Sequence, residues 1–160
     1  MRISSTAAFL VGVLLVWPAF AEYYPNQHAG VSVYLPDHWL VSMVDDYQIQ
    51  ASTQDQSVGI IMRVFEGNDV EAAIQALEAE VMPMVSDFSS TGYYDDNVNG
   101  MPAVVGEAQG IIDGYDADLG LMVILTPTNR ALLVFALGER EAVAYYRGDI
   151  DAILANIAPL

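Results

Sequence analysis

The sequence contains no cysteine and no lysine. Without cysteine the chain cannot form a disulfide, so the stability of a domain of this length must come from a hydrophobic core. Without lysine its positive side chains are five arginines, which face 21 acidic residues and leave a net charge of −16. Nucleic acids and anionic lipid headgroups bind to basic surfaces. We therefore expect neither of them as a partner.

The acidic balance has two interpretations, and the sequence leaves both open. A strongly negative surface favours cationic partners or divalent ions through long-range attraction. It is also typical of a protein in a salty medium, where ions screen charges over about 8 Å or less. The absence of lysine fits adaptation to salt better than it fits a specific partner.

The first 21 residues have the pattern of a signal peptide. Arg2 precedes an apolar run over residues 7–16, which is followed by Trp17-Pro18 and by the small-x-small triplet 19–21. A membrane-spanning helix needs about 20 apolar residues, and this run is too short. We predict cleavage before Glu22 and a periplasmic or secreted protein that does not span the membrane once it is processed.

The rest of the chain predicts one domain preceded by a short arm. Residues 22–29 are polar and aromatic without periodicity, which indicates a flexible arm, and residues 30–160 predict a single α+β domain. Alternating or short apolar runs indicate strands over 30–36, 40–44, 47–51, 57–65, 103–113, 117–126 and 130–137. The last run is apolar on both faces, so it belongs inside a sheet. Asp113-Gly114 and residues 127–129 are turn sequences that join antiparallel neighbours.

A first helix is predicted over residues 68–85, where apolar residues recur at spacings of three and four. Asn68 is a suitable N-cap, and Glu71 three residues later can complete a capping box. Pro83 should end or kink this helix, because proline lacks the N–H that continues the hydrogen-bond ladder.

A second helix is predicted over residues 143–157 from the same spacing. Gly148 is unfavourable inside a helix, so it marks either close packing against the sheet or a bend. The order of elements predicts an α+β sandwich, with a central antiparallel sheet of about six strands flanked by two main helices.

Two short motifs and the order of elements carry a family resemblance. Residues 35–39 read LPDHW, similar to a P-x-x-W beginning, and residues 98–103 read VNGMPA, similar to a v-x-G-x-P-A entry into three strands. With the central helix and the C-terminal helix, this order resembles the PsbP and Mog-type α/β/α sandwich family, which includes small exported bacterial proteins. The resemblance implies a non-enzymatic adaptor, assembly factor or binding domain without a cofactor. With the acidic composition, it leads us to expect another exported protein or a cationic ligand as partner.

The two histidines do not make a metal site on their own. A zinc site needs three or four ligands, and no cysteine is available to add to His28 and His38. Asp37 can orient the ring of His38. We therefore interpret His38 as a turn residue beside a core tryptophan, Trp39.

The segment 95–100 (DDNVNG) is the best match to a metal-binding loop. Asp95, Asn97, Asn99 and Gly100 match positions one, three, five and six of a calcium loop. The position of the bidentate glutamate falls on a glycine, so the main interpretation is a turn whose side chains bond their own backbone. A calcium-dependent binding protein is the alternative.

No nucleophile lies in a recognisable catalytic motif. Ser86, Ser89 and Ser90 cluster near the end of the first helix, where a loop explains them. A hydrolase built on scattered carboxylates is a further alternative, because paired acids leave no local signature. We assign no catalytic, cofactor-binding or metal-binding residue. Tyrosine pairs at 23–24, 93–94 and 145–146 are candidates for an interface where one member is exposed.

Overall fold

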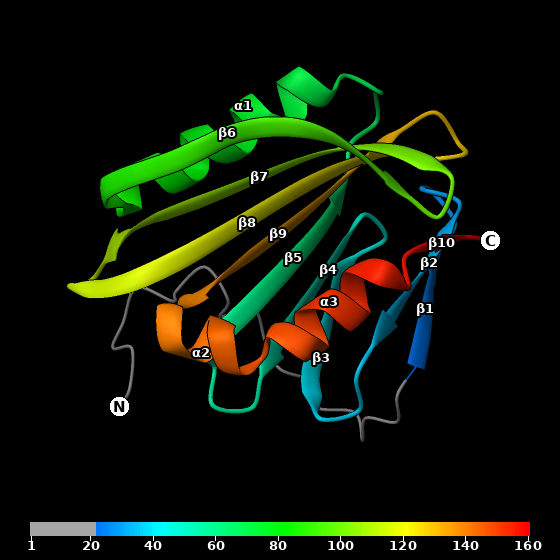
Figure 1. Ribbon diagram of the computed structural model, residues 1–160. Coiled ribbons are helices and arrows are strands. Elements are labelled where there is room, and N and C mark those ends of the chain that lie inside the picture. Colours follow the sequence, from blue (N-terminus) through cyan, green and yellow to red (C-terminus); the bar gives the residue numbers. More distant parts are fainter. Residues whose placement is uncertain (1–21) are drawn as a thin grey trace.

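The computed structural model describes residues 22–160, and the predicted signal peptide lies outside this range. Within it the chain forms two antiparallel sheets and three α-helices (Figure 1). The large sheet has seven strands in the order β3 (Trp39–Asp45), β4 (Gln48–Thr53), β5 (Val58–Val64), β9 (Ala131–Glu139), β8 (Tyr115–Leu125), β7 (Met101–Ile112) and β6 (Ser86–Val98). The small sheet has the order β1 (Glu22–Asn26), β2 (Val31–Leu35) and β10 (Ala158–Pro159).

Strand β9 lies at the centre of the large sheet because its side chains are apolar on both faces. It pairs with β5 on one side and β8 on the other. Leu132 and Val134 are buried in the core on one face, and Leu133 and Phe135 are buried in the core on the other. The interior strand predicted from this run is confirmed. The Asp113-Gly114 turn that joins β7 to β8 also has the expected positive φ angles, 52° and 84°.

The large sheet has seven strands and not about six, and a second sheet accompanies it. The run over 30–36 forms β2 of the small sheet, and residues 22–26, expected in a flexible arm, form β1 against β2. The serine-rich segment that we interpreted as a loop begins the long edge strand β6. Every residue of β6 except Val98 is exposed, so the sequence has no apolar alternation to reveal it. Its pairing with β7 defines it.

Helix α1 (Val70–Val81) has the predicted apolar stripe but a different N-cap. Asp69 caps the helix, and its carboxylate accepts a hydrogen bond of 3.0 Å from the N–H of Ala72. Asn68 instead donates from its amide to Asn129 Oδ1 at 2.9 Å. The predicted capping box with Glu71 is therefore wrong, because the cap lies one residue later. The helix ends in the 3₁₀ turn Met82–Met84, which contains Pro83 as expected.

The predicted C-terminal helix is divided into α2 (Arg140–Tyr145) and α3 (Arg147–Ala155). The interruption is at Tyr146, two residues before Gly148, where the backbone has φ −90° and ψ 10°. The ring of Tyr146 packs edge-on against Trp39, with ring centroids 6.3 Å apart. We attribute the interruption to this contact, since it turns the chain so that both helices lie on the sheet.

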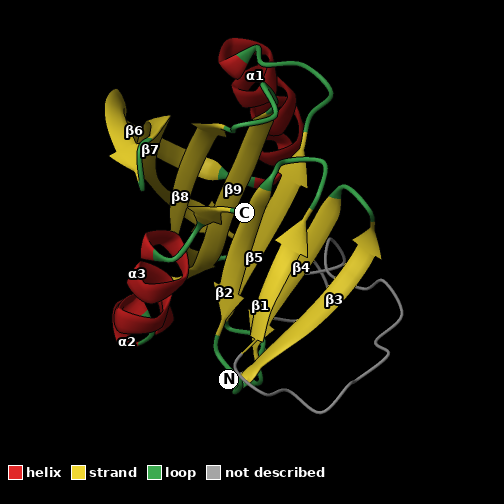
Figure 2. Cartoon of the chain, turned by 90° about the vertical axis from the view of Figure 1, so that its right-hand side faces the viewer, coloured by secondary structure: helices red, strands yellow, loops and turns green. Residues whose placement is uncertain are grey.

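The two faces of the large sheet are covered differently (Figure 2). We call them the α3 face, which α2, α3 and the small sheet cover, and the α1 face, which α1 covers. Side chains alternate between the faces, so that even-numbered residues of β8 and β9 lie on the α3 face and odd-numbered ones on the α1 face. Among the described residues, none of the helices is long and apolar enough to cross a membrane.

Candidate functional site

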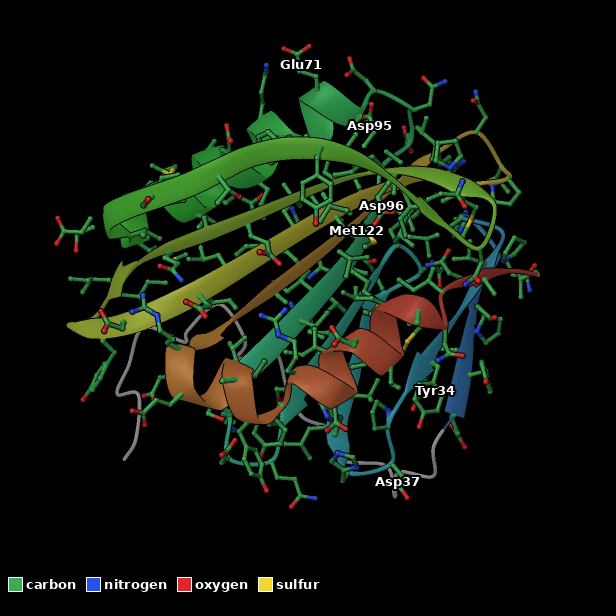
Figure 3. All side chains as sticks on the ribbon, in the orientation of Figure 1. Tyr34, Asp37, Glu71, Asp95, Asp96 and Met122 are labelled. Carbon is green, nitrogen blue, oxygen red and sulfur yellow. The ribbon has the colours of Figure 1, made fainter. Side chains whose placement is uncertain are left out.

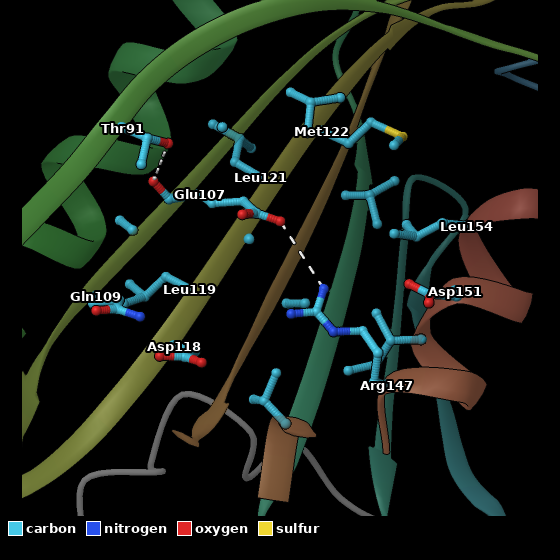
Figure 4. Close-up of a pocket in the computed structure, with 18 of the residues that line it drawn as sticks. Thr91, Glu107, Gln109, Asp118, Leu119, Leu121, Met122, Arg147, Asp151 and Leu154 are labelled. Atoms are coloured by element: carbon cyan, nitrogen blue, oxygen red, sulfur yellow. Dashed lines mark hydrogen bonds and ion pairs between the residues drawn. The ribbon is translucent and has the colours of Figure 1, made fainter. Parts of the chain in front are cut away.

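A groove opens between helix α3 and the α3 face of the large sheet (Figure 4). Its volume is about 320 Å³, at the lower end of the range of roughly 300–1,000 Å³ for small-molecule sites. We call it the α3 groove. Its apolar floor and wall are formed by Val105, Met122, Val134, Ala136, Val143, Ile150 and Leu154.

The floor of the α3 groove is open at Gly120. This residue lies on β8, next to Met122 on the same face, and a Cβ added there would meet no atom within 4 Å. The floor is therefore hollow because β8 carries no side chain at this position. Any larger residue would project into the groove.

The rim of the α3 groove is charged. Glu107 on β7 and Arg147 on α3 approach each other across the opening, with Oε1 and Nη1 4.0 Å apart (Figure 4). Their side chains are 61% and 55% exposed, so solvent screens the pair and it contributes little stability. Asp118 on β8 accepts a hydrogen bond of 3.1 Å from Arg140. Asp151 on α3 forms no ion pair within the described part of the chain.

Other acidic side chains are spread over the surface and do not join the groove in one patch. Figure 3 shows Glu71 on α1 and Asp95 on β6 at one end of the molecule and Asp37 at the other. In residues 22–160, no group of three or more histidine, aspartate and glutamate side chains is placed to hold a metal ion.

His38 lies beside a carboxylate that the sequence analysis missed. Its Nε2 is 2.5 Å from Asp149 Oδ2 on α3, whereas its Nδ1 is 3.3 Å from Asp37. The indole N–H of Trp39 donates to the same Asp149 oxygen at 3.0 Å. The hydrogen bond with Asp149 raises the pKa of His38. Burial opposes ionisation of Asp149, but the hydrogen bonds from Trp39 and His38 outweigh it and lower the pKa of this carboxyl.

This cluster ties α3 to the turn before β3. His38 is therefore in a turn beside the core residue Trp39, as predicted, but its nearer partner is 111 positions away in sequence. Sequence spacing gives no signal for such a contact. His28 is placed differently, because its ring stacks on Tyr47 with centroids 4.2 Å apart.

The segment 95–100 forms the end of β6 and its hairpin turn to β7. Asn97 Oδ1 accepts from the N–H of Gly100 at 2.9 Å, and Asn99 and Gly100 have φ angles of 50° and 87°. The predicted turn is confirmed. The amide of Asn99 donates to the backbone oxygens of Ala155 at 2.9 Å and Ile157 at 2.7 Å, which holds the end of α3. Both asparagines of the calcium template are thus engaged in backbone contacts.

The tyrosine pairs differ in exposure. On α2 the side chain of Tyr145 is 81% exposed, while its neighbour Tyr146 packs against Trp39, so one member of this pair points inward as expected. On β6 the hydroxyl of Tyr93 donates to Glu78 on α1 at 2.6 Å. Burial and this carboxylate raise the pKa of Tyr93 to about 12.

Comparison with protein-family models gives no match, and comparison with curated protein sequences gives none either. Solved structures do match. CyanoP, the cyanobacterial PsbP of Synechocystis sp., has a TM-score of 0.63 at 8% identity, over 94% of this chain and 99% of that chain. The Saccharomyces cerevisiae Ran-binding protein Mog1p has a TM-score of 0.54 at 11% identity, over 87% and 93% of the two chains. LpqN of Mycobacterium tuberculosis, described as involved in cell envelope biogenesis, has a TM-score of 0.51 at 10% identity, over 80% and 82%.

The fold therefore belongs to a known class of α+β sandwiches. The chain has the PsbP/Mog-like fold, and the resemblance inferred from its sequence motifs is confirmed at the level of the fold.

Proposed function

We propose that this protein is an exported, non-enzymatic binding or adaptor domain that binds another exported protein at the α3 groove. The observation that carries the proposal is the groove itself, which combines a hollow apolar floor at Gly120 with a charged rim. Export is supported by the signal-peptide pattern of residues 1–21. A binding role is supported by the likeness of the fold to that of a Ran-binding protein, Mog1p.

The charges of the rim define the chemistry of the proposed partner segment. Asp151 forms no ion pair among the described residues, and the pair between Glu107 and Arg147 is wide and exposed. A partner segment with a lysine or arginine next to an apolar side chain fits this arrangement, because the cation can pair with Asp151 while the apolar group fills the space above Gly120. Such a contact is strengthened by the negative charge of the whole chain, which steers cationic partners towards it.

Site-specific photo-cross-linking in the cells that export the protein tests this proposal. A photoreactive residue at Leu154, on the groove wall, should give one discrete adduct with an exported protein. Gly120→Leu should abolish the adduct by filling the floor, and Asp151→Lys should weaken it by reversing the rim charge. Gly148→Ala is the matched control, because a Cβ at Gly148 also meets no atom within 4 Å but lies outside the groove.

Two results contradict the proposal. The first is an adduct of equal yield in the Gly120→Leu variant, and the second is an equal yield of the same adduct from a photoreactive residue at Gln50, on the far face of the sheet. N-terminal sequencing of the fractionated protein checks export separately: we expect a chain that starts at Glu22. A chain in the cytosolic fraction that retains Met1 contradicts it.

A further inference from the structure

Helix α1 leaves part of the α1 face uncovered. A helix of 12 residues is about 18 Å long, whereas β7 with 12 residues and β8 with 11 extend over roughly 35–40 Å. Beside the last turns of α1 and beyond its end, towards the β7–β8 turn, the sheet therefore forms the floor of a second cavity of about 100 Å³. We call it the α1 trough.

The floor of the α1 trough is apolar. Phe135 and Leu137 of β9 contribute to it, together with Ile61 of β5 on the neighbouring strand. Phe135 is buried, whereas Leu137 and Ile61 are half-buried and face the open side. The volume is smaller than the roughly 150 Å³ of an engineered apolar cavity that takes benzene. The trough therefore has room for a short alkyl chain.

One carboxylate at the end of the trough lacks a partner. Glu139 follows Leu137 on the same face of β9, and its Oε1 is buried without a hydrogen bond among the described residues. A buried carboxylate oxygen without a donor costs free energy that a bound cationic donor can recover. The arginines nearby are engaged elsewhere: Arg63 holds Glu80 at 2.8 Å, and Arg140 contacts Asp118 at 3.1 Å.

An alkyl floor that ends in an unpaired carboxylate is complementary to one kind of group. A primary ammonium is a compact cation with three donors, and the chain has no lysine of its own to supply one. A guanidinium is planar and wider, and an alcohol lacks the charge.

We propose that the α1 trough binds a free primary alkylamine of about four to six carbons in its ammonium form. The chain lies on Ile61, Phe135 and Leu137, and the ammonium donates to Glu139. This site is on the opposite face from the α3 groove, and the inference does not rest on the proposed function.

Titration calorimetry and amide NMR with hexylammonium test the inference on the whole protein. The measurements use about 1 M sodium chloride, where the screening length is about 3 Å, so that attraction to the acidic surface in general is suppressed. Hexylammonium should bind with a stoichiometry of one and shift the amides of Ile61 and Leu137. Hexanol, of equal length without the charge, should bind at least about tenfold more weakly, because charge-assisted hydrogen bonds are the stronger ones. Hexanoate should not bind.

Variants distinguish the contribution of the carboxylate to binding from that of the apolar floor. Glu139→Gln should weaken hexylammonium binding about tenfold and leave hexanol binding unchanged. Leu137→Thr should weaken both ligands, because it removes apolar floor. Glu107→Gln, which removes a carboxylate from the other face of the sheet, is the matched control and should change neither.

Three results overturn the inference. One is equal affinity of hexylammonium for wild type and Glu139→Gln. Another is a set of shifted amides that lies on the α3 face. The third is binding of Nα-acetyl-lysine amide as tight as that of hexylammonium, which would assign the trough to a lysine of a partner protein instead of a free amine.

Discussion

The two faces of the large sheet are hollowed for different reasons. On the α3 face, β8 carries Gly120 where a side chain would fill the space beside α3, and the result is a groove of about 320 Å³ with a charged rim. On the α1 face, the helix is shorter than the strands beneath it, and the result is an apolar trough of about 100 Å³. The same strands contribute to both hollows, because successive side chains point to opposite faces.

The ion pairs on the two faces also differ in how tightly their charges are held. The ion pair across the α3 groove is 4.0 Å wide and mostly exposed, so a partner can displace it at little cost. On the α1 face, Arg63 binds Glu80 through two nitrogens at 2.8 and 3.4 Å and Gln48 through a third at 2.9 Å. The first arrangement leaves charges available for binding, and the second uses them to join α1 to the sheet.

The largest expected effect comes from truncating the α1-face core. Phe135→Ala should lower the free energy of unfolding by about 3–5 kcal/mol, because a buried aromatic ring is lost and a cavity remains. Met122→Ala on the α3 face should cost about 2 kcal/mol, at the low end for such a change, because it only widens an existing groove. Urea unfolding measures both. Equal losses would mean that the two faces are packed alike.

Replacing glycine by alanine should change stability in opposite directions at Gly106 and Gly120. A Cβ on Gly106 would lie 2.5 Å from the ring of Tyr93, so Gly106→Ala should destabilise the protein by about 1–3 kcal/mol and release the ring. Gly120→Ala should stabilise it by about 0.5 kcal/mol, since the added methyl meets nothing and the unfolded chain loses freedom. Urea midpoints check both variants. A loss of stability in Gly120→Ala would contradict the open floor.

Removing one arginine from each face tests the difference between the ion pairs. Arg63→Met should cost about 1–3 kcal/mol, because its partners are partly buried and would lose charge-assisted hydrogen bonds. Arg147→Met should cost less than about 0.5 kcal/mol, because the pair that it breaks is wide and exposed. Thermal unfolding at fixed ionic strength compares them. The reverse order would show that the groove pair stabilises the fold.

The smallest effects are those of pH, and they differ between the faces. On the α3 face, the pKa of His38 is raised above 6.5. The protonated ring therefore adds to the free energy of unfolding below that pH, and this stabilisation is lost as the pH rises through the pKa of the folded protein. The pKa of Asp149 is lowered below 3.8. The ionised carboxylate therefore adds to the free energy of unfolding above that pH, and this stabilisation is lost as the pH falls through the pKa of the folded protein. The melting temperature of wild type should therefore exceed that of Asp149→Asn most between about pH 4 and 6.5. A constant difference from pH 4 to 9 would exclude His38 from the effect.

On the α1 face, the pH dependence of stability comes from Tyr93 and lies at alkaline pH. Because the pKa of Tyr93 is raised, its protonated hydroxyl adds fully to the free energy of unfolding below pH 10. This stabilisation is lost as the pH rises towards about 12. Absorbance titration should show a tyrosine that ionises near pH 12, and Tyr93→Phe should remove this component. If Gly106→Ala also restores an ordinary pKa, the ring is held by its contact with β7.

Local patterns predicted the elements that bury a regular stripe or an apolar run. They gave β9, α1, the β7–β8 turn and the asparagine-glycine turn before Met101, because each depends on neighbours in sequence. They missed β6, whose side chains are exposed on both faces. They also placed the N-cap of α1 at Asn68, since asparagine and aspartate are equally suitable caps and only the structure decides between them.

The candidate sites could not be predicted from sequence patterns, because their residues are far apart in the sequence or depend on packing. Glu107 and Arg147 are 40 positions apart and come together only because α3 packs on the α3 face of the large sheet, to which β7 belongs. The partner of His38, Asp149, was hidden for the same reason. Glu139 lies two residues past the predicted end of its strand, and its missing hydrogen bond cannot be seen without the packing around it.

We expect the partner to bind the α3 groove and not the α1 trough. The most direct measurement is the affinity of the cross-linked partner, once purified, for Gly120→Leu and Leu137→Thr side by side. We expect a loss of at least about tenfold for Gly120→Leu, because the leucine occupies the space of the partner's apolar group, and no change for Leu137→Thr. Wild-type affinity in Gly120→Leu, or a loss confined to Leu137→Thr, would show that the partner does not bind the α3 groove.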